Sequence, residues 1–411
     1  MEKRRAPKLR FRGFTDDWEQ RKLGEVCNVS SGIMGDSLLT DGVYRITRIE
    51  TIADGVVDEA RIGYTNQKPD DVFRLNPGDI LYSNINSLPQ MGKVAQYTGN
   101  SVLYHGINLL RLSPKNDVDS NFILYLLNTE SSRNWAQTHA NQAVSQASIN
   151  RSLLESQEVM VGRTDEQKQI GNYFKDLDYL ITLHQRKYDM LQKVKKSMLE
   201  KMFPKNGSKV PEIRFAGFTD DWEKRKLGEM GTTFTGLSGK TKDDFGHGAG
   251  RFVTYMNVFT NPVSDLEVVD AVEIDNSQST VQYGDVFFTT SSETPEEVGM
   301  SSVWLGNTTN TYLNSFCFGY RLAEANDPYY MAYMLRSENV RGKIIFLAQG
   351  ISRYNISKNR VMQIEVPIPN LDEQRLLGKY FKNLDHLITL HQRKLEKLKK
   401  LKKSMLEEMF I

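Results

Sequence analysis

Two matched groups of polar side chains in the sequence could hydrogen-bond a ligand. In each half of the chain one group follows a short apolar run, and the other lies in a polar loop further on, at Ala143–Asn150 and Gly350–Asn355. Amide, hydroxyl and guanidinium groups of this kind bind base edges and phosphates of DNA. A solvated loop is the alternative interpretation. The candidate DNA-contacting residues are Ser83, Asn84, Asn86, Gln142, Gln146, Thr290, Ser291, Ser292, Arg353 and Tyr354.

The sequence offers no comparable set of residues for catalysis. Asp327-Pro328-Tyr329-Tyr330 is similar to the Asp-Pro-Pro-Tyr motif of amino-methyltransferases, but it lacks the second proline. In the other half Asp119 begins the matched stretch, so we interpret both aspartates as helix caps. No nucleotide-binding lysine loop and no nucleophile elbow occurs in the sequence. We therefore expect no catalytic residue, metal or cofactor in this chain.

The elements that must position the polar groups occur twice. Asp165–Phe203 returns without a gap at Asp372–Phe410, and Pro7–Glu25 returns at Pro211–Glu229. The chain is therefore a tandem duplication of a globular region followed by a long helix. The predicted parts are a first globular domain at 1–164, a central helix at 165–204, a second globular domain at 205–371 and a C-terminal helix at 372–411.

Apolar residues along both long segments recur at alternating four- and three-residue steps, which is the heptad pattern of a coiled coil. The alternative is two surface helices on separate cores. Because the joint Pro204–Ser208 is short, the second helix can pack on the first only by running back, which predicts an antiparallel pair. The predicted seam is Phe174, Leu177, Ile181, His184, Tyr188, Leu191, Phe381, Leu384, Ile388, His391, Leu395 and Leu398.

Polar residues also recur in this seam. His184 and His391 share one position, and Lys195 and Lys402 share another. No cysteine or carboxylate lies at ligand spacing beside the histidines. We therefore interpret all four as residues that fix register and partner choice rather than as metal ligands.

Each globular region is predicted to mix helix and strand, which gives an α+β fold. One helix is expected in each, at Ser120–Gln137 and Asp327–Leu347. The glycine pairs Gly32/Gly35 and Gly236/Gly239 are interpreted as turns that need positive φ. Strands are expected at Tyr44–Ile49, Gly78–Tyr82, Asn108–Leu112, Phe252–Val258, Gly284–Phe288 and Phe316–Leu322.

Composition excludes several classes of protein. The chain has 411 residues, 25% of them charged, with a net charge of +2. It is long enough for two or three cores and is not a polycation, although local basic faces still allow a DNA ligand. Its two cysteines lie at unmatched places, and no apolar run reaches the length of a membrane span. We expect a cytoplasmic protein with no membrane association.

This organisation resembles the specificity (S) subunits of type I restriction-modification systems. The most specific shared parts are GFTDDWE at Gly13–Glu19 and Gly217–Glu223, the Gly-Asp strands at Gly78 and Gly284, and the Asp-Glu-Gln helices. The resemblance implies two target-recognition domains separated by an antiparallel coiled coil. Each domain would read one half of a split, asymmetric site in double-stranded DNA.

The resemblance also implies partners. The helices would space the two half-sites and dock two adenine-methyltransferase (M) subunits, which recruit restriction (R) subunits. S-adenosylmethionine, ATP and Mg are then expected on those partners and not on this chain. Trp18 and Trp222 are expected either at the docking surfaces or in the core beneath them. One departure from the family pattern is Gly162-Arg163-Thr164, where the second copy has Pro369-Asn370-Leu371.

A function of another class remains open from the residues alone. In a cytoplasmic adaptor the coiled coil would join two protein-binding domains, and no nucleic acid would bind. Salt-sensitive binding of a DNA duplex distinguishes the two functions. A self-sufficient methyltransferase is disfavoured by the missing cofactor motifs.

Overall fold

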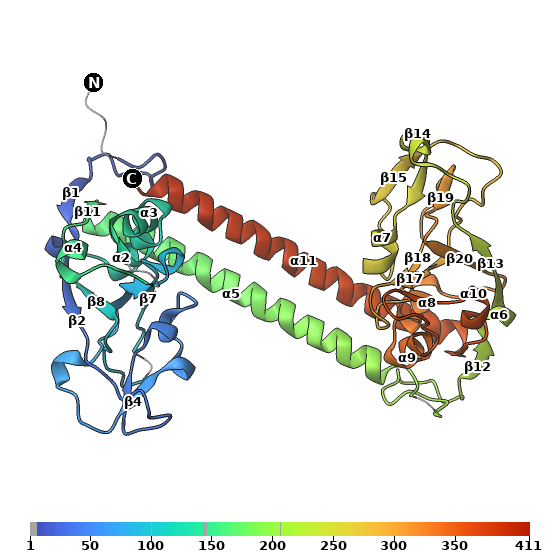
Figure 1. Ribbon diagram of the computed structural model, residues 1–411, viewed down its shortest axis with the longest axis horizontal. Helices are drawn as coiled ribbons and strands as arrows, with labels where there is room; N and C mark the ends of the chain where they lie inside the picture. Colours follow the sequence, from blue (N-terminus) through green and yellow to red (C-terminus); the bar gives the residue numbers. More distant parts are fainter. Residues whose placement is uncertain (1–5, 100, 143–145, 206) are drawn as a thin grey trace. The chain divides into compact units, whose positions relative to one another are not determined.

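The computed structural model describes residues 6–99, 101–142, 146–205 and 207–411, and the chain divides into two compact units (Figure 1). The first unit runs to Gln185 and also contains Arg393–Ile411; the second is Arg186–Gln392. The two long helices are α5 (Thr164–Lys201) and α11 (Leu371–Met409). Each unit therefore joins one globular region to parts of both helices, while the predicted domain boundaries stay predictions.

A four-stranded antiparallel sheet lies at the centre of each globular region. The order is β2-β8-β5-β7 in the first unit and β13-β20-β16-β18 in the second. The central strands β5 and β16 are buried at every residue, which explains their continuous apolar sequences. The strands are β2 Cys27–Ser31, β5 Ile80–Ser83, β7 Val94–Gln96, β8 Leu109–Pro114, β13 Gly231–Thr235, β16 Val286–Thr289, β18 Ser301–Val303 and β20 Cys317–Leu322.

Shorter elements complete each unit and confirm the mixed helix and strand content. In the first they are β1 Glu19–Lys22, α1 Leu23–Val26, β3 Tyr44–Ile46, β4 Gly63–Thr65, β6 Ile85–Asn86, α2 Ser120–Leu127, α3 Glu130–His139, β9 Asn141–Gln142, β10 Ala147–Ser148, α4 Arg151–Glu155 and β11 Glu158–Val161. In the second they are β12 Glu223–Lys226, α6 Leu227–Met230, β14 Phe245–Val253, α7 Tyr255–Thr260, β15 Val269–Val272, β17 Ser291–Ser292, β19 Thr311–Leu313, α8 Pro328–Met334, α9 Glu338–Phe346, β21 Tyr354–Asn355, α10 Lys358–Val361 and β22 Glu365–Ile368.

The single helix predicted in each globular region is broken in two. The predicted caps are correct, because Asp119 accepts from the Phe122 amide at 2.9 Å and Asp327 from the Tyr330 amide at 2.8 Å. The break follows at Thr129 in the first unit and at Ser337 in the second. Both hydroxyls donate to the carbonyl three residues earlier. Such side-chain bonds compete with the helix, and a new helix starts at the glutamate that follows.

Two predicted strands also end early. The strand expected at Tyr44–Ile49 stops at Ile46, and the one expected at Phe252–Val258 stops at Val253. In the second unit the Thr254 side chain accepts from the Asn257 amide at 3.2 Å and begins helix α7. A threonine cap therefore outweighs the β-propensity of the residues around it.

The matched glycines serve close packing more than positive φ, which corrects that interpretation for three of the four. Among them Gly239 has a positive φ, of 66°. A Cβ atom at Gly32 would collide with the backbone carbonyl of Gly106, and one at Gly236 with that of Asn314. Gly32 and Gly236 therefore let neighbouring backbone segments approach each other.

Within each unit the long helices pair in antiparallel directions, as predicted. In the first unit the N-terminal part of α5 lies against the C-terminal part of α11, with Phe174 and Phe410 in ring contact. The second unit repeats this with Phe203 and Phe381. All twelve predicted seam residues are buried or partly buried. The ends of the seam also belong to the globular cores of the two units.

Candidate nucleic-acid interface

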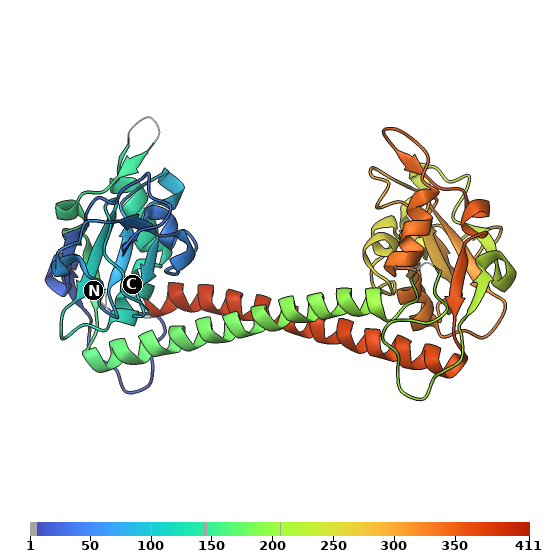
Figure 2. The same cartoon turned by 90° about the horizontal axis from the view of Figure 1, so that it is seen from below.

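The described parts of the polar loops contain short paired strands that project from the globular regions (Figure 2). In the first unit β10 pairs antiparallel with β6 and with β9. In the second, β21 pairs antiparallel with β17, and Gln349 bridges to Asn355. Ala143, Val144 and Ser145 of the predicted loop lie outside the described residues, as does Asn206 in the joint after α5.

Four of the ten candidate residues lie below the surface. Ser83 and Asn84 are 1% and 9% exposed, and the Asn84 amide donates to the Ile149 carbonyl at 3.0 Å. Ser291 and Ser292 are 5% and 9% exposed. Asn84 bonds the backbone that follows β10, and Ser291 accepts from Arg353, so these two side chains support the projecting segments from beneath. The polar type of these four residues, which follow an apolar run in the sequence, therefore does not predict that they are exposed.

The exposed candidates lie at the projections themselves. Gln142, Gln146 and Arg353 are exposed, while Asn86, Thr290 and Tyr354 are partly buried. Asn86 donates to Ser83 Oγ at 3.1 Å, and Thr290 donates to the Phe316 carbonyl at 2.9 Å. Contact with DNA stays a prediction for all of them, and geometry favours the exposed residues.

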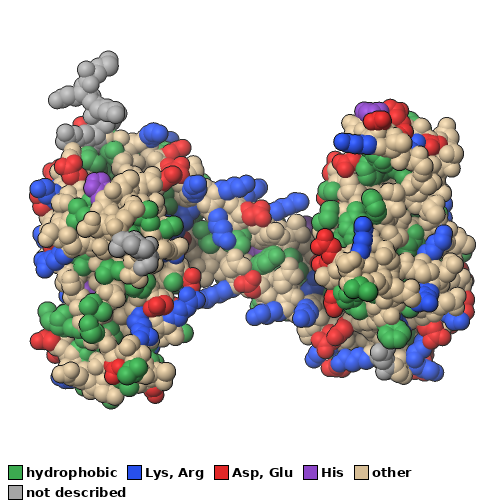
Figure 3. Space-filling model, in the orientation of Figure 1, with side chains coloured by type: hydrophobic (Ala, Val, Ile, Leu, Met, Phe, Trp, Pro, Cys, Tyr) green, Lys and Arg blue, Asp and Glu red, His purple; other side chains and the backbone are tan. Residues whose placement is uncertain are grey.

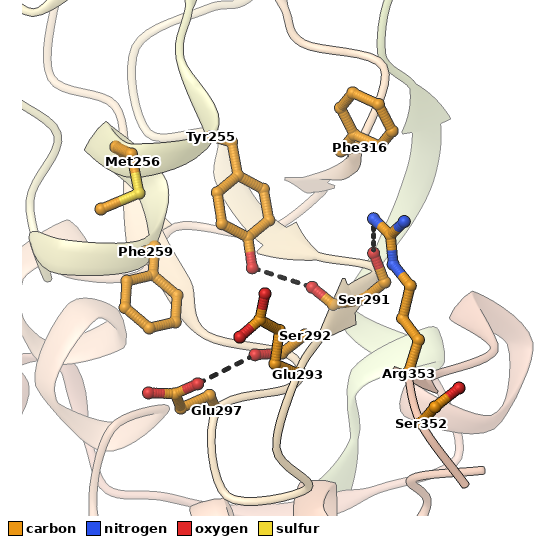
Figure 4. A pocket seen from close by; sticks show the side chains of 10 residues that line it. All are labelled: Tyr255, Met256, Phe259, Ser291, Ser292, Glu293, Glu297, Phe316, Ser352 and Arg353. Carbon is orange, nitrogen blue, oxygen red and sulfur yellow. Dashed lines mark hydrogen bonds between the residues drawn. The ribbon is translucent and has the colours of Figure 1, made fainter. Parts of the chain in front are cut away.

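A cavity of about 770 Å³ opens beside Arg353 in the second unit (Figure 4). Its apolar wall includes the half-exposed Phe316 and Met256, each 56% exposed. Its polar wall includes Glu293 and Glu297, and Ser292 Oγ donates to Glu297 at 3.1 Å. The cavity therefore combines aromatic surface, two carboxylates and one guanidinium.

Helix α7 supplies residues to this cavity that sequence reasoning missed. Tyr255, Met256 and Phe259 lie on α7 and line it. The Tyr255 hydroxyl donates to the Ser291 carbonyl at 2.8 Å, and burial raises the pKa of Tyr255. Thr254 is the residue from which the sequence could have predicted this helix, because threonine often caps the first turn of a helix.

A partly buried arginine holds α7 in place. Arg336 Nη2 donates to the carbonyls of Val258, Phe259 and Asn261, each at 3.0 Å, at the C-terminal end of the helix. Burial, together with the nearby positive charge of Arg341, lowers the pKa of Arg336 to about 10. The corresponding residue after α2 in the first unit is Asn128, so this arrangement belongs to the second unit.

The two repeated motifs meet at a buried ion pair. Arg10 binds Glu166 of the Asp-Glu-Gln motif through two hydrogen bonds of 2.7 Å, and Trp18 Nε1 donates to the same carboxylate at 2.9 Å. Arg214, Glu373 and Trp222 repeat the set in the second unit. Trp18 and Trp222 are each 2% exposed. Of the two expected places for these tryptophans, the docking surface and the core, the structure shows the core.

The departure at Gly162 leaves the junction between domain and helix unchanged. Gln167 Nε2 donates to the Gly162 carbonyl at 2.8 Å, and Gln374 Nε2 donates to the Pro369 carbonyl at 3.0 Å. The side-chain oxygens of the same glutamines accept from the amides of Asp119 and Asp327. The contact that recurs in both units is to a backbone carbonyl, which glycine and proline both provide.

Lysine and arginine side chains gather along the exposed faces of α5 and α11 (Figure 3). Within the described residues no group of three or more His, Cys, Asp or Glu side chains is placed to hold a metal ion. In the same part of the chain, no helix is long and apolar enough to cross a membrane.

Two similar α+β units, each joined to antiparallel helix segments and each carrying a polar projection, make this chain a structural tandem duplication. The family model described as "Type I restriction modification DNA specificity domain" matches residues 15–193 and 219–400. The chain therefore belongs to this family and is a specificity subunit of a type I restriction-modification system.

Similar proteins agree with this assignment. The Methanocaldococcus jannaschii protein named "Putative type I restriction enzyme MjaX specificity subunit" is 31% identical over 95% of this chain and 92% of its own length. The MjaVIII specificity subunit of the same organism is 23% identical over 95% of this chain and 91% of its own. The crystal structure of the S subunit from M. genitalium covers 99% of both chains with a TM-score of 0.62 at 15% identity, a likeness of fold.

Proposed function

We propose that this chain reads a bipartite, asymmetric site in double-stranded DNA, one half per globular domain. The observation that carries the proposal is the pair of polar projections, which occupy matched places in two similar units but differ in sequence. Equivalent scaffolds with different exposed side chains would recognise different sequences. The predicted domains at 1–164 and 205–371 are the units of this recognition.

Partner subunits would supply the catalytic activity at the DNA site that this chain reads. Two M subunits, which methylate adenine, would dock on the repeated helix surfaces, and R subunits would join through them. Exposed leucines support a docking role: Leu376, Leu387 and Leu390 of α11 are 42%, 41% and 38% exposed and share one helix face. S-adenosylmethionine, ATP and Mg would belong to the partners, and this chain would be non-catalytic.

A binding experiment separates this function from the adaptor alternative. The purified chain with its methyltransferase partner is titrated with duplex DNA at several salt concentrations. We expect specific binding that weakens steeply with salt, because lysines and arginines replace counterions on the phosphates. An adaptor would form the protein complex without shifting the duplex at any salt concentration.

A further inference from the structure

One exposed position is equivalent in the two projections. In β10 Ala147 pairs with Asn86 and Ser148 with Ile85; in β21 Tyr354 pairs with Ser292 and Asn355 with Ser291. The residue immediately before each strand is therefore at the same place in the hairpin register. That residue is Gln146 in the first unit and Arg353 in the second, and both are exposed.

The second unit orients this residue from beneath. Arg353 Nη2 donates to Ser291 Oγ at 3.1 Å, and the Ser291 carbonyl accepts from the Tyr255 hydroxyl (Figure 4). Ser291 is 5% exposed, so the arginine is held by a buried group. A guanidinium has five N–H donors, and one such bond leaves a fork for a ligand.

The charges around Arg353 favour a base over a phosphate as its ligand. The carboxylates of Glu293 and Glu297 line the same cavity and would repel a phosphate. A carboxylate accepts from the N4 amino group of cytosine, while an arginine fork fits O6 and N7 of guanine. One G·C pair offers both sets of groups in the major groove.

We propose that this position reads one base pair in each half-site, with Arg353 reading guanine and Gln146 reading adenine. Glutamine pairs with N6 and N7 of adenine as arginine pairs with O6 and N7 of guanine. The inference rests on the proposed function, because it requires that each projection enters a DNA groove. It assigns a base to one named residue of each domain.

Reciprocal substitution tests the proposal. Arg353→Gln and Gln146→Arg chains are assembled with the methyltransferase partner, and the methylated sites are mapped in a host genome. We expect Arg353→Gln to replace one G by A in the second half-site, and Gln146→Arg to replace one A by G in the first. Binding of the original duplex should weaken roughly 5- to 150-fold relative to the newly preferred one.

Controls distinguish a failure of this proposal from a loss of the fold and from a failure of the proposed function. Lys358→Gln removes an exposed charge of the same domain and should leave every base preference unchanged. Thermal unfolding of each variant reports its fold, and each substitution tests the position independently of the other. Uniform weakening on all sequences would identify a phosphate contact and overturn the proposal, as would unchanged sites. If the wild-type complex bound no DNA, the proposed function itself would fail.

Discussion

The ammonium group of Lys402 lies 2.6 Å from Asp178 Oδ1, which joins the C-terminal part of α11 to the N-terminal part of α5. The hydroxyl of Tyr125 on α2 donates to the same carboxylate at 2.8 Å. Lys195, Asp385 and Tyr333 repeat the arrangement in the second unit, with the ion pair at 2.5 Å. Each set of three residues links both long helices to a globular domain. The three side chains meet in this way when the two helices are in this register.

Removing Lys402 should therefore weaken the first unit. We expect Lys402→Met to lower the free energy of unfolding by about 1 kcal/mol, because the pair is partly exposed and water screens it. Urea unfolding measures the change, and the exposed neighbour Lys403→Met is the matched control. Equal stability of the two variants would show that the ion pair does not hold the register.

Replacing the buried carboxylate of Glu166 should lower the free energy of unfolding far more than replacing Lys402. Glu166 is 0% exposed and binds both Arg10 and Trp18. Glu166→Gln leaves the arginine without its counter-charge, and we expect a loss of about 3 kcal/mol in the free energy of unfolding. Asp165→Asn, on the exposed neighbour, should change it little. A loss below about 1 kcal/mol for Glu166→Gln would contradict the structural role of this motif.

The last aromatic residue of the chain should act as a core residue of the first domain. Phe410 is 7% exposed and its ring centroid lies 5.2 Å from that of Phe122 and 5.9 Å from that of Phe174. We expect Phe410→Ala to cost about 3–5 kcal/mol of unfolding free energy. Ile411→Ala, at a residue 52% exposed, is the control. Similar unfolding midpoints for the two variants would exclude this packing.

Acid should destabilise the first unit through His105. Burial, together with the nearby charge of Arg111, lowers the pKa of His105 to about 4 from an ordinary value of 6.5. Between these values the unfolded chain binds a proton that the folded chain does not, so stability falls as pH falls from about 6.5 through 4. The full effect is up to about 3 kcal/mol.

The histidine contribution can be isolated by comparison with a variant. His105→Gln lacks the titrating ring and should unfold with a smaller dependence on pH in this range. Urea unfolding at intervals between pH 7 and pH 4 measures the difference between the two proteins. Parallel stability curves for the wild type and the variant would contradict a buried neutral His105.

The repeat and the seam could be predicted because they depend on spacing, which the sequence displays directly. Asp119 and Asp327 were likewise recognisable as caps, because a cap acts on residues a few positions away. The Lys402–Asp178 and Arg10–Glu166 pairs join residues far apart in the chain. The type of each residue therefore did not predict which residue it would pair with. Ser83 and Ser291 are candidate DNA-contacting residues by type and yet are buried, because the identity of a small polar side chain does not report which face of a strand it occupies.

The helices should also act as a spacer between the half-sites, if the proposed function is correct. One added heptad lengthens a helix by about 10.5 Å, which corresponds to roughly three base pairs. A heptad inserted into both helices should lengthen the unspecified spacer by about that number while keeping both half-sequences. Insertion into one helix alone should mismatch the pair and destabilise the complex. Mapping of methylated sites that showed the original spacer would mean that the helices do not set it.

The central claim, one domain for each half-site, is tested most directly by mapping methylated adenines for a chimera. Residues 1–164 are replaced by the equivalent domain of another family member, and the chain is expressed with its methyltransferase partner. We predict that one half of the recognised site changes to that of the donor while the other half is retained. If both halves changed, or if neither did, the assignment of one half-site to each domain would be wrong.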